Sequence, residues 1–166
     1  MSKNKHITIE NVTVIDAGAK GKSIAKAPDG RVIFISNAIP GDVVDVQTTK
    51  KKSAYYEGFV TKYHQLSEQR VTPVCSHFGY CGGCKWQDMN YQSQLFYKQK
   101  EVENNLVRLG RIEIPAVMPI IGSDETYYYR NKMEFSFSDM RWLTPDEIKK
   151  ADETDNRNAL GFHIAG

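Results

Sequence analysis

The sequence predicts a mainly β chain: an N-terminal OB-like five-stranded β-barrel, followed by an incomplete α+β domain that carries a cysteine loop. Three observations support this prediction. The first 64 residues alternate apolar and polar residues in short β-branched runs, and turns rich in glycine and proline separate these runs. After His64 the pattern changes to a loop rich in glycine and cysteine and one helical stretch.

The expected strands of the first region share a period of two and lie roughly 8–15 residues apart. No stretch between them fits a helix. This spacing suits a small closed or nearly closed barrel, in which closure protects the edges of the sheet. The expected strands are 6–15, 23–27, 31–35, 42–48 and 55–63, with turns at Gly18, Gly21, 28–30 and 40–41.

The second region offers fewer regular elements. A helix is expected at about 91–109, because apolar residues recur at helical intervals, Asp88 or Asn90 can cap its start and Gly110 can end it. A strand is expected at 127–137, a short helix at 144–148, and a closing strand at 160–164 that pairs with the first as a hairpin. The expected domains are 1–66, the barrel, and 67–166, part of a second domain, so the natural protein is expected to continue.

Composition places the chain among globular proteins. It has 166 residues, with 22 Lys+Arg against 20 Asp+Glu and a formal net charge of +2. No stretch approaches ~18 consecutive apolar residues, and the N-terminus lacks the apolar core of a secretory signal, so we expect a cytoplasmic protein that does not span a membrane. Residues 1–64 hold ten basic and six acidic residues, which places the positive excess at the front.

Basic and aromatic residues of the barrel form a candidate surface for single-stranded nucleic acid. Lysines would follow the phosphates while rings stack on bases. In the alternative interpretation, about half of the rings fill the barrel and the lysines keep the protein soluble. The set comprises Lys20, Lys22, Lys50, Lys51, Lys52 and Lys62, with Phe34, Tyr55, Tyr56 and Phe59.

Two further segments contain residues that could contact phosphate. Arg130 and Lys132 alternate with other residues on the expected strand 127–137, so they would project from one face as a second basic contact. Surface salt bridges are the alternative. Residues 16–23 do not form a phosphate-binding P-loop, because Asp16 stands where that motif needs glycine.

The three cysteines follow a C-x5-C-x2-C pattern that favours a metal centre. Cys81 and Cys84 can converge on one metal, and the glycines between the cysteines let backbone N–H groups approach the sulfurs. Structural thiols and a redox pair of Cys81 and Cys84 are the competing interpretations. Structural zinc and a cubane cluster each need four ligands, and Cys75 makes only the third. Zinc would recruit His64, His77 or His163, so the residues leave zinc and iron–sulfur open.

The barrel segments 18–25, 29–35 and 38–46 resemble the TRAM domain, an OB-like RNA-binding barrel. The later segments 73–75, 81–87, 91–98, 129–132 and 161–163 resemble, in that order, the SAM-dependent RNA (uracil-5-)-methyltransferases of the 23S ribosomal RNA type. Residues 139–160 match no element of this family and look like an insertion.

The resemblance implies a specific set of functions. Cys75, Cys81 and Cys84 match three of the four ligands of a structural [4Fe–4S] cluster, whose fourth cysteine this sequence lacks. None of them matches the catalytic nucleophile, and the family's S-adenosylmethionine-binding domain is missing.

The leading hypothesis is therefore the RNA-binding N-terminal portion of a 23S rRNA uracil-C5 methyltransferase, monomeric, without a protein partner and inactive by itself. In this portion the cluster is expected to be absent or unstable. The alternative hypothesis is a stand-alone RNA-binding module that contains zinc.

Overall fold

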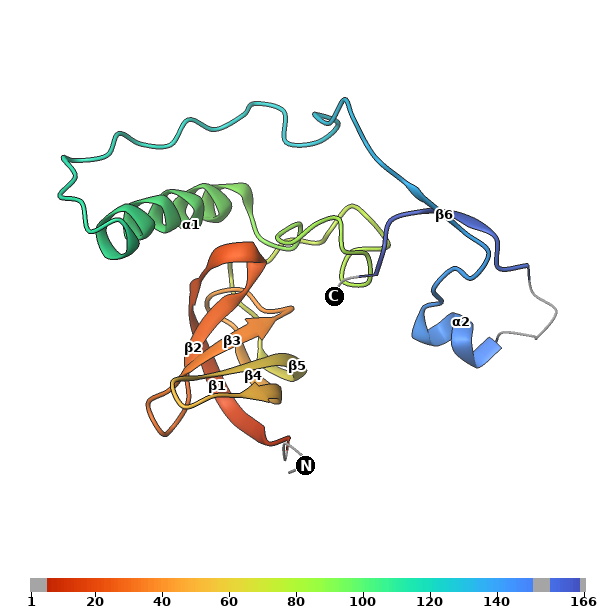
Figure 1. Cartoon of the computed structure of the whole chain (residues 1–166), viewed down its shortest axis with the longest axis horizontal. Coiled ribbons are helices and arrows are strands. Elements are labelled where there is room, and N and C mark those ends of the chain that lie inside the picture. The colour runs from red at the N-terminus through yellow and green to blue at the C-terminus, as the bar shows by residue number, and fades with distance from the viewer. Residues whose placement is uncertain (1–5, 151–155, 165–166) are drawn as a thin grey trace. The chain divides into compact units, whose positions relative to one another are not determined.

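A computed structural model describes residues 6–150 and 156–164, and it confirms the predicted barrel and mainly β fold class (Figure 1). The chain divides into two compact units, and each is described by itself. The first comprises Met1–Thr72 and Trp86–Ser123, with the barrel and helix α1 (Tyr91–Asn104). The second comprises Pro73–Lys85 and Asp124–Gly166, with the cysteine loop and helix α2 (Pro145–Lys150).

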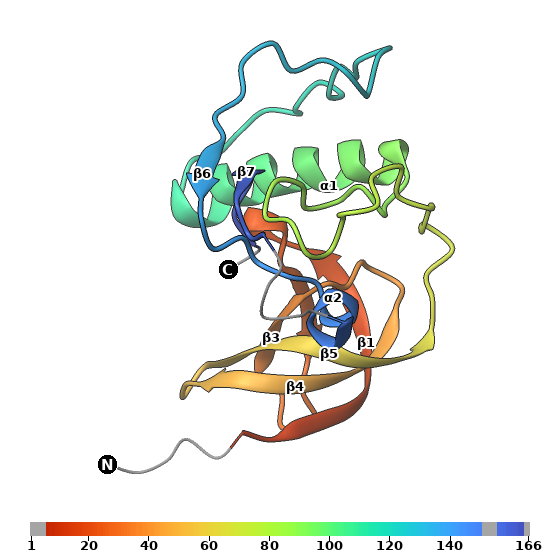
Figure 2. The same cartoon turned by 90° about the vertical axis from the view of Figure 1, so that its right-hand side faces the viewer.

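All five expected barrel strands are present, with modest shifts of their ends. They follow the order β1-β2-β3-β5-β4, and β4 pairs back with β1, which closes the barrel (Figure 2). Neighbouring strands are antiparallel except β3 and β5, which are parallel. Closure leaves no unpaired sheet edge. The strands are β1 (Thr8–Ala17), β2 (Ser23–Lys26), β3 (Val32–Ser36), β4 (Val43–Lys51) and β5 (Tyr55–Gln65).

The interior of the barrel is aliphatic, because the inward positions of the strands carry Val, Ile or Ala. Ile33 and Ile35 of β3 and Val44 and Val46 of β4 are fully buried, while the residues between them face outward. This alternation is typical of strands that bury one face. Tyr56 is the ring that reaches into this core, with 2% of its surface exposed.

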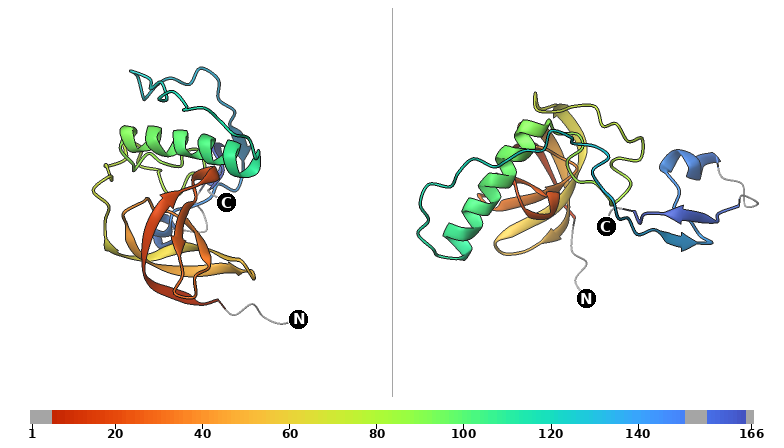
Figure 3. Two further views of the ribbon diagram at one scale, coloured as in Figure 1. Left: turned by 90° about the vertical axis from the view of Figure 1, so that its left-hand side faces the viewer. Right: turned by 90° about the horizontal axis from the view of Figure 1, so that it is seen from above.

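Helix α1 lies across one end of the barrel (Figure 3). Asn90 Oδ1 accepts a hydrogen bond from the Ser93 N–H at 2.9 Å, so Asn90 is the cap of the two that were expected. The helix continues as a π-helical turn over Asn105–Leu109, which completes the expected range. No helix in the described part of the chain is long and apolar enough to cross a membrane. The residues that pack α1 on the barrel are Ala17, Ile39, Met89 and Tyr97.

The second unit contains short elements. Strand β6 (Ser136–Ser138) pairs with β7 (Ala159–Gly161) in an antiparallel hairpin. Helix α2 begins with a capping box, in which the Thr144 N–H donates to Glu147 Oε2 at 2.8 Å and the Glu147 N–H donates to Thr144 Oγ1 at 3.3 Å. The expected short helix is thus confirmed.

The expected strand at 127–137 is wrong over most of its length. Only residues 136 and 137 of it lie in β6, and the closing strand ends at Gly161 rather than 164, although the two segments do pair as the expected hairpin. An alternating pattern forms a strand only where a neighbour accepts its backbone hydrogen bonds. In the described residues, β7 pairs with this segment only over Ser136–Ser138, and Tyr128 is fully exposed.

Candidate nucleic-acid interface

The strand register places basic and aromatic side chains side by side on the outside of the barrel. Phe34 of β3 lies between Ile24 of β2 and Glu57 of β5, and Lys50 of β4 lies beyond Glu57. Further along the same face, Phe59 of β5 lies between Ser36 and Gln47. We call the face defined by Lys22, Phe34, Lys50, Tyr55 and Phe59 the outer strip.

The outer strip has rings in its middle and cations at both ends. The rings of Phe34 and Tyr55 meet edge to face with their centroids 5.5 Å apart, and Phe59 is 41% exposed. Lys22 Nζ donates to Ser36 Oγ at 2.5 Å, and Lys50 Nζ lies 3.1 Å from Glu57 Oε1. Exposed rings can stack on bases while the flanking ammonium groups meet phosphates. Among the four predicted rings, three lie on this face.

Tyr56 is the exception, and its expected place on the binding surface is wrong. Successive residues of a strand face opposite sides, and the register that turns Tyr55 outward turns Tyr56 into the core. The Tyr56 hydroxyl donates to Asp29 Oδ2 at 2.9 Å, and the Arg31 guanidinium lies 4.1 Å from its ring centroid. A hydrogen bond from the Arg31 side chain holds the pKa of Asp29 far below its ordinary value. The contacts among Asp29, Arg31 and Tyr56 stabilise the turn between β2 and β3.

The remaining predicted lysines of the barrel are exposed and fall into separate groups. Lys51 and Lys52 lie at the tip of the β4–β5 hairpin, and Lys20 lies in the short 3-10 turn (Ala19–Gly21) at the opposite end. Lys62 of β5 lies opposite Asp45 of β4. The Asn11 N–H and the His64 ring lower the pKa of Asp45 by hydrogen bonding to its carboxylate.

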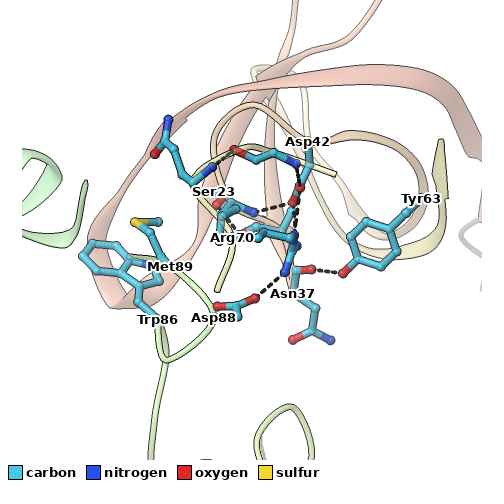
Figure 4. Close-up of polar contacts among 12 residues, drawn as sticks. Ser23, Asn37, Asp42, Tyr63, Arg70, Trp86, Asp88 and Met89 are labelled. Carbon is cyan, nitrogen blue, oxygen red and sulfur yellow. Dashed lines mark hydrogen bonds and ion pairs between the residues drawn. The ribbon is translucent and has the colours of Figure 1, made fainter. Parts of the chain in front are cut away.

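A buried ion cluster lies at the barrel end that α1 covers (Figure 4). Asp42 is fully buried, and its carboxylate accepts hydrogen bonds from Arg70 Nε at 2.9 Å and Arg70 Nη2 at 2.6 Å. It also accepts from the backbone N–H groups of Ile39 and Ser67. The remaining guanidinium nitrogen, Arg70 Nη1, lies 2.6 Å from Asp88 Oδ2. We call Asp42, Arg70 and Asp88 the Arg70 clip.

Burial alone would lower the pKa of Arg70, but hydrogen bonds to Asp42 and the charges of both aspartates outweigh it and raise that pKa. Arg70 therefore stays charged. Sequence reasoning missed this cluster, because Asp42 and Arg70 are 28 positions apart and no local pattern joins them. The exposed Lys26 at the end of β2, beside the outer strip, was missed as well.

The second predicted basic contact lies in the other compact unit. Because 127–135 is not a strand, Arg130 and Lys132 are not placed on one face of a sheet, and that part of the expectation is wrong. Lys132 Nζ lies 3.4 Å from Glu134 Oε1, with both side chains more than four-fifths exposed. This contact corresponds to the alternative of a surface salt bridge.

The cysteine loop, Pro73–Lys85, is a series of turns. The Cys81 N–H donates to the His77 carbonyl at 3.0 Å, and the Gly82 N–H donates to the His163 carbonyl at 3.0 Å. The Gly83 N–H lies 3.3 Å from Cys81 Sγ, an N–H to sulfur contact of the kind the sequence predicted. Cys75 and Cys84 are exposed and Cys81 is half-buried.

The donor set fits a cubane cluster only in part. Such a cluster takes four ligands, and the chain has three cysteines. Within residues 6–150 and 156–164, no three His, Cys, Asp or Glu side chains gather into a group that could hold a metal ion. The cysteine loop thus supplies three of the four thiolate ligands that such a cluster takes.

Comparison with known proteins agrees with this geometry. Residues 3–61 match the TRAM domain family. An uncharacterized RNA methyltransferase of Bacteroides thetaiotaomicron is 53% identical over 148 residues, which cover 89% of this chain and 32% of that protein. One from Porphyromonas gingivalis is 43% identical over 92% of this chain and 33% of its own length. A 23S rRNA (uracil(1939)-C(5))-methyltransferase of Acidovorax sp. is 37% identical over 76% of this chain and 27% of its own length.

The chain thus spans about a third of the length of the relatives it matches. Most of its residues take part in these matches, in both compact units. Residues 3–61 are thus a TRAM domain, and most of the chain is similar to about a third of the length of these RNA methyltransferases.

Proposed function

We propose that this chain is the RNA-binding N-terminal portion of a SAM-dependent 23S rRNA uracil-C5 methyltransferase, and that it holds RNA on the outer strip. The observation that carries the proposal is the placement of Phe34, Tyr55 and Phe59 between lysines on one face of a closed barrel. The TRAM match and the name of the Acidovorax relative support RNA, and 23S rRNA in particular, as the partner.

The lysines and the aromatic rings contribute to RNA binding in different ways. The lysines neutralise phosphates, so their contribution falls as salt rises. The rings stack on bases, and that contribution depends little on salt because it involves no ion release. Lys51 and Lys52 extend the strip at the hairpin tip, where they are exposed and can reach a backbone without refolding.

A charge-matched pair of double variants tests the lysines. Binding of a single-stranded fragment of 23S rRNA is measured as a function of salt for the unaltered chain, for Lys51→Ala/Lys52→Ala and for Lys149→Ala/Lys150→Ala of α2. The first variant is expected to bind more weakly, with a slope of log K against log salt shallower by about 1.4, or ~0.7 for each lost phosphate contact. The second has the same net charge and is expected to keep the slope. Equal slopes in all three chains would contradict a phosphate contact by Lys51 and Lys52 and would support the alternative that these lysines keep the protein soluble.

A ring variant tests stacking separately. Phe59→Ala removes a ring that is 41% exposed and lies outside the barrel core, so folding is expected to remain intact. RNA affinity is expected to fall by about 1–3 kcal/mol at every salt concentration, with the slope unchanged. An unchanged affinity would show that the RNA does not lie on the outer strip.

The methyl transfer itself belongs to the remainder of the longer protein in this proposal. SAM would supply the methyl group there, and none of Cys75, Cys81 and Cys84 acts as the nucleophile. The isolated 166-residue chain, monomeric in the proposal, is expected to transfer no methyl group from SAM to a uridine-containing rRNA fragment. Incorporation of labelled methyl by this chain would contradict the proposal.

For the cysteine loop we propose three ligands of an incomplete [4Fe–4S] site, at Cys75, Cys81 and Cys84. The order of the three thiols and the Gly83 N–H beside Cys81 Sγ support it. Metal analysis of the chain after anaerobic purification is expected to find far fewer than the four irons of a complete cluster. About four irons per chain would contradict the expected instability, and stoichiometric zinc would favour the zinc-containing module.

A further inference from the structure

The two arms of the cysteine loop begin and end at the Arg70 clip. The first arm, Ser67–Thr72, leaves the barrel, and the second arm, Trp86–Asn90, leads into α1; both belong to the first compact unit. The Val71 N–H donates to the Asp88 carbonyl at 3.0 Å, and the Asn90 N–H donates to the Gln69 carbonyl at 2.8 Å. These two hydrogen bonds join the segment that precedes the cysteine loop to the segment that follows it.

The arms are also fixed to the barrel, through one carboxylate. Asp42, which follows the turn and immediately precedes β4, holds the first arm through the Ser67 N–H at 2.9 Å and through the Arg70 guanidinium. Arg70 Nη1 then reaches Asp88 of the second arm. A guanidinium presents donors in a planar fork, so one side chain can bind both oxygens of Asp42 and an oxygen of Asp88 together.

We propose that Arg70 is a positioning residue that joins the two arms to each other and to the barrel, so that the base of the cysteine loop opens and closes as a local unit. The barrel core lies on separate residues and keeps its own hydrogen bonds when the base opens. The separation of the two arms, between which Cys75, Cys81 and Cys84 lie in the sequence, then depends on this side chain together with the backbone hydrogen bonds. This inference does not rest on RNA binding or on a metal.

Asp88→Asn is the variant that tests the clip, because it removes the charge of the second arm and leaves the pair of Arg70 and Asp42 in place. Hydrogen exchange of the full chain is followed at the Val71 and Asn90 amides and at the barrel amides of Ile33 and Val46. The variant is expected to exchange about tenfold faster at Val71 and Asn90, and in the unaltered chain these two amides are expected to have a lower free energy of opening than Ile33 and Val46. Asp29→Asn, which breaks the ion pair at the other end of the barrel, is the matched control and is expected to leave both loop-base amides unchanged.

Arg70→Lys provides a second measurement that keeps the charge and removes the fork. It is expected to open the loop base as well, which separates geometry from charge. Unchanged exchange at Val71 and Asn90 in both variants would overturn the proposal. Free energies of opening at Val71 and Asn90 as high as those at Ile33 and Val46 in the unaltered chain would overturn it too, since the loop base would then open only together with the barrel.

Discussion

The two ends of the barrel carry the same three residue types in different surroundings. At the β2–β3 turn, Arg31 pairs with Asp29 and lies over the ring of Tyr56; at the end under α1, Arg70 pairs with Asp42 and lies 5.1 Å from the ring centroid of Tyr63. The carboxylate of Asp29 is 44% exposed, while that of Asp42 has no exposed surface. Water therefore competes for the first pair and is excluded from the second.

An arginine–aspartate pair contributes more to stability when it is buried than when it is exposed. An exposed pair is screened and adds little to stability, whereas removal of one partner of a buried pair leaves a charge without solvation. The exposed pair accordingly shapes a turn, and the buried pair connects distant parts of the chain. Three predictions test this contrast, in order of decreasing effect.

The largest effect is expected from Arg70→Met. It leaves the buried carboxylate of Asp42 without its cation and is expected to lower the free energy of unfolding by about 3–5 kcal/mol. Denaturant unfolding of the two chains measures the difference. Adding Asp42→Asn to this variant removes the stranded charge and is expected to restore part of the loss; fully additive effects would contradict the pairing.

A smaller effect is expected from the turn glycines at the two ends. Gly30 and Gly41 both have positive φ, at +84° and +94°, so alanine is strained at either position by about 1–2 kcal/mol. A Cβ at Gly41 would lie 2.6 Å from Ser67 Oγ, while one at Gly30 would meet nothing within 4 Å. Gly41→Ala is therefore expected to destabilise the chain by about 1–3 kcal/mol more than Gly30→Ala, as measured by thermal or denaturant unfolding. Equal losses of stability in the two variants would show that Ser67 moves aside and that the Cβ contact at Gly41 adds no cost.

The smallest effect is expected from Asp29→Asn, and it is expected to depend on pH. The hydrogen bond from Arg31 lowers the folded-state pKa of Asp29, so its contribution is present above the ordinary carboxyl pKa and is lost as the pH falls below about 4. The unaltered chain is expected to be slightly more stable than the variant at neutral pH and to lose this advantage in acid. Because the pair is exposed, salt is expected to diminish the difference. An advantage that does not diminish between about pH 5 and about pH 2 would assign it to something other than the ionised carboxylate.

Two segments with the same alternation show how far sequence patterns reach. Residues 31–35 were predicted as a strand and form β3, which has β2 on one side and β5 on the other. Residues 127–135 show a similar pattern and form no strand in the described structure. The pattern records which side chains would share a face, but a strand also needs neighbours for its N–H and C=O groups.

The local features of this protein follow from its sequence: the five barrel strands, the helix at about 91–109 with Asp88 or Asn90 as its cap, and the order of segments that resembles the family. These follow from residue period, capping and turn chemistry, which act over a few positions. The tertiary structure decided which of Tyr55 and Tyr56 faces solvent, and which aspartate and arginine meet under α1. Both depend on strand register and on contacts between residues such as Asp42 and Arg70, which only the closed barrel brings together.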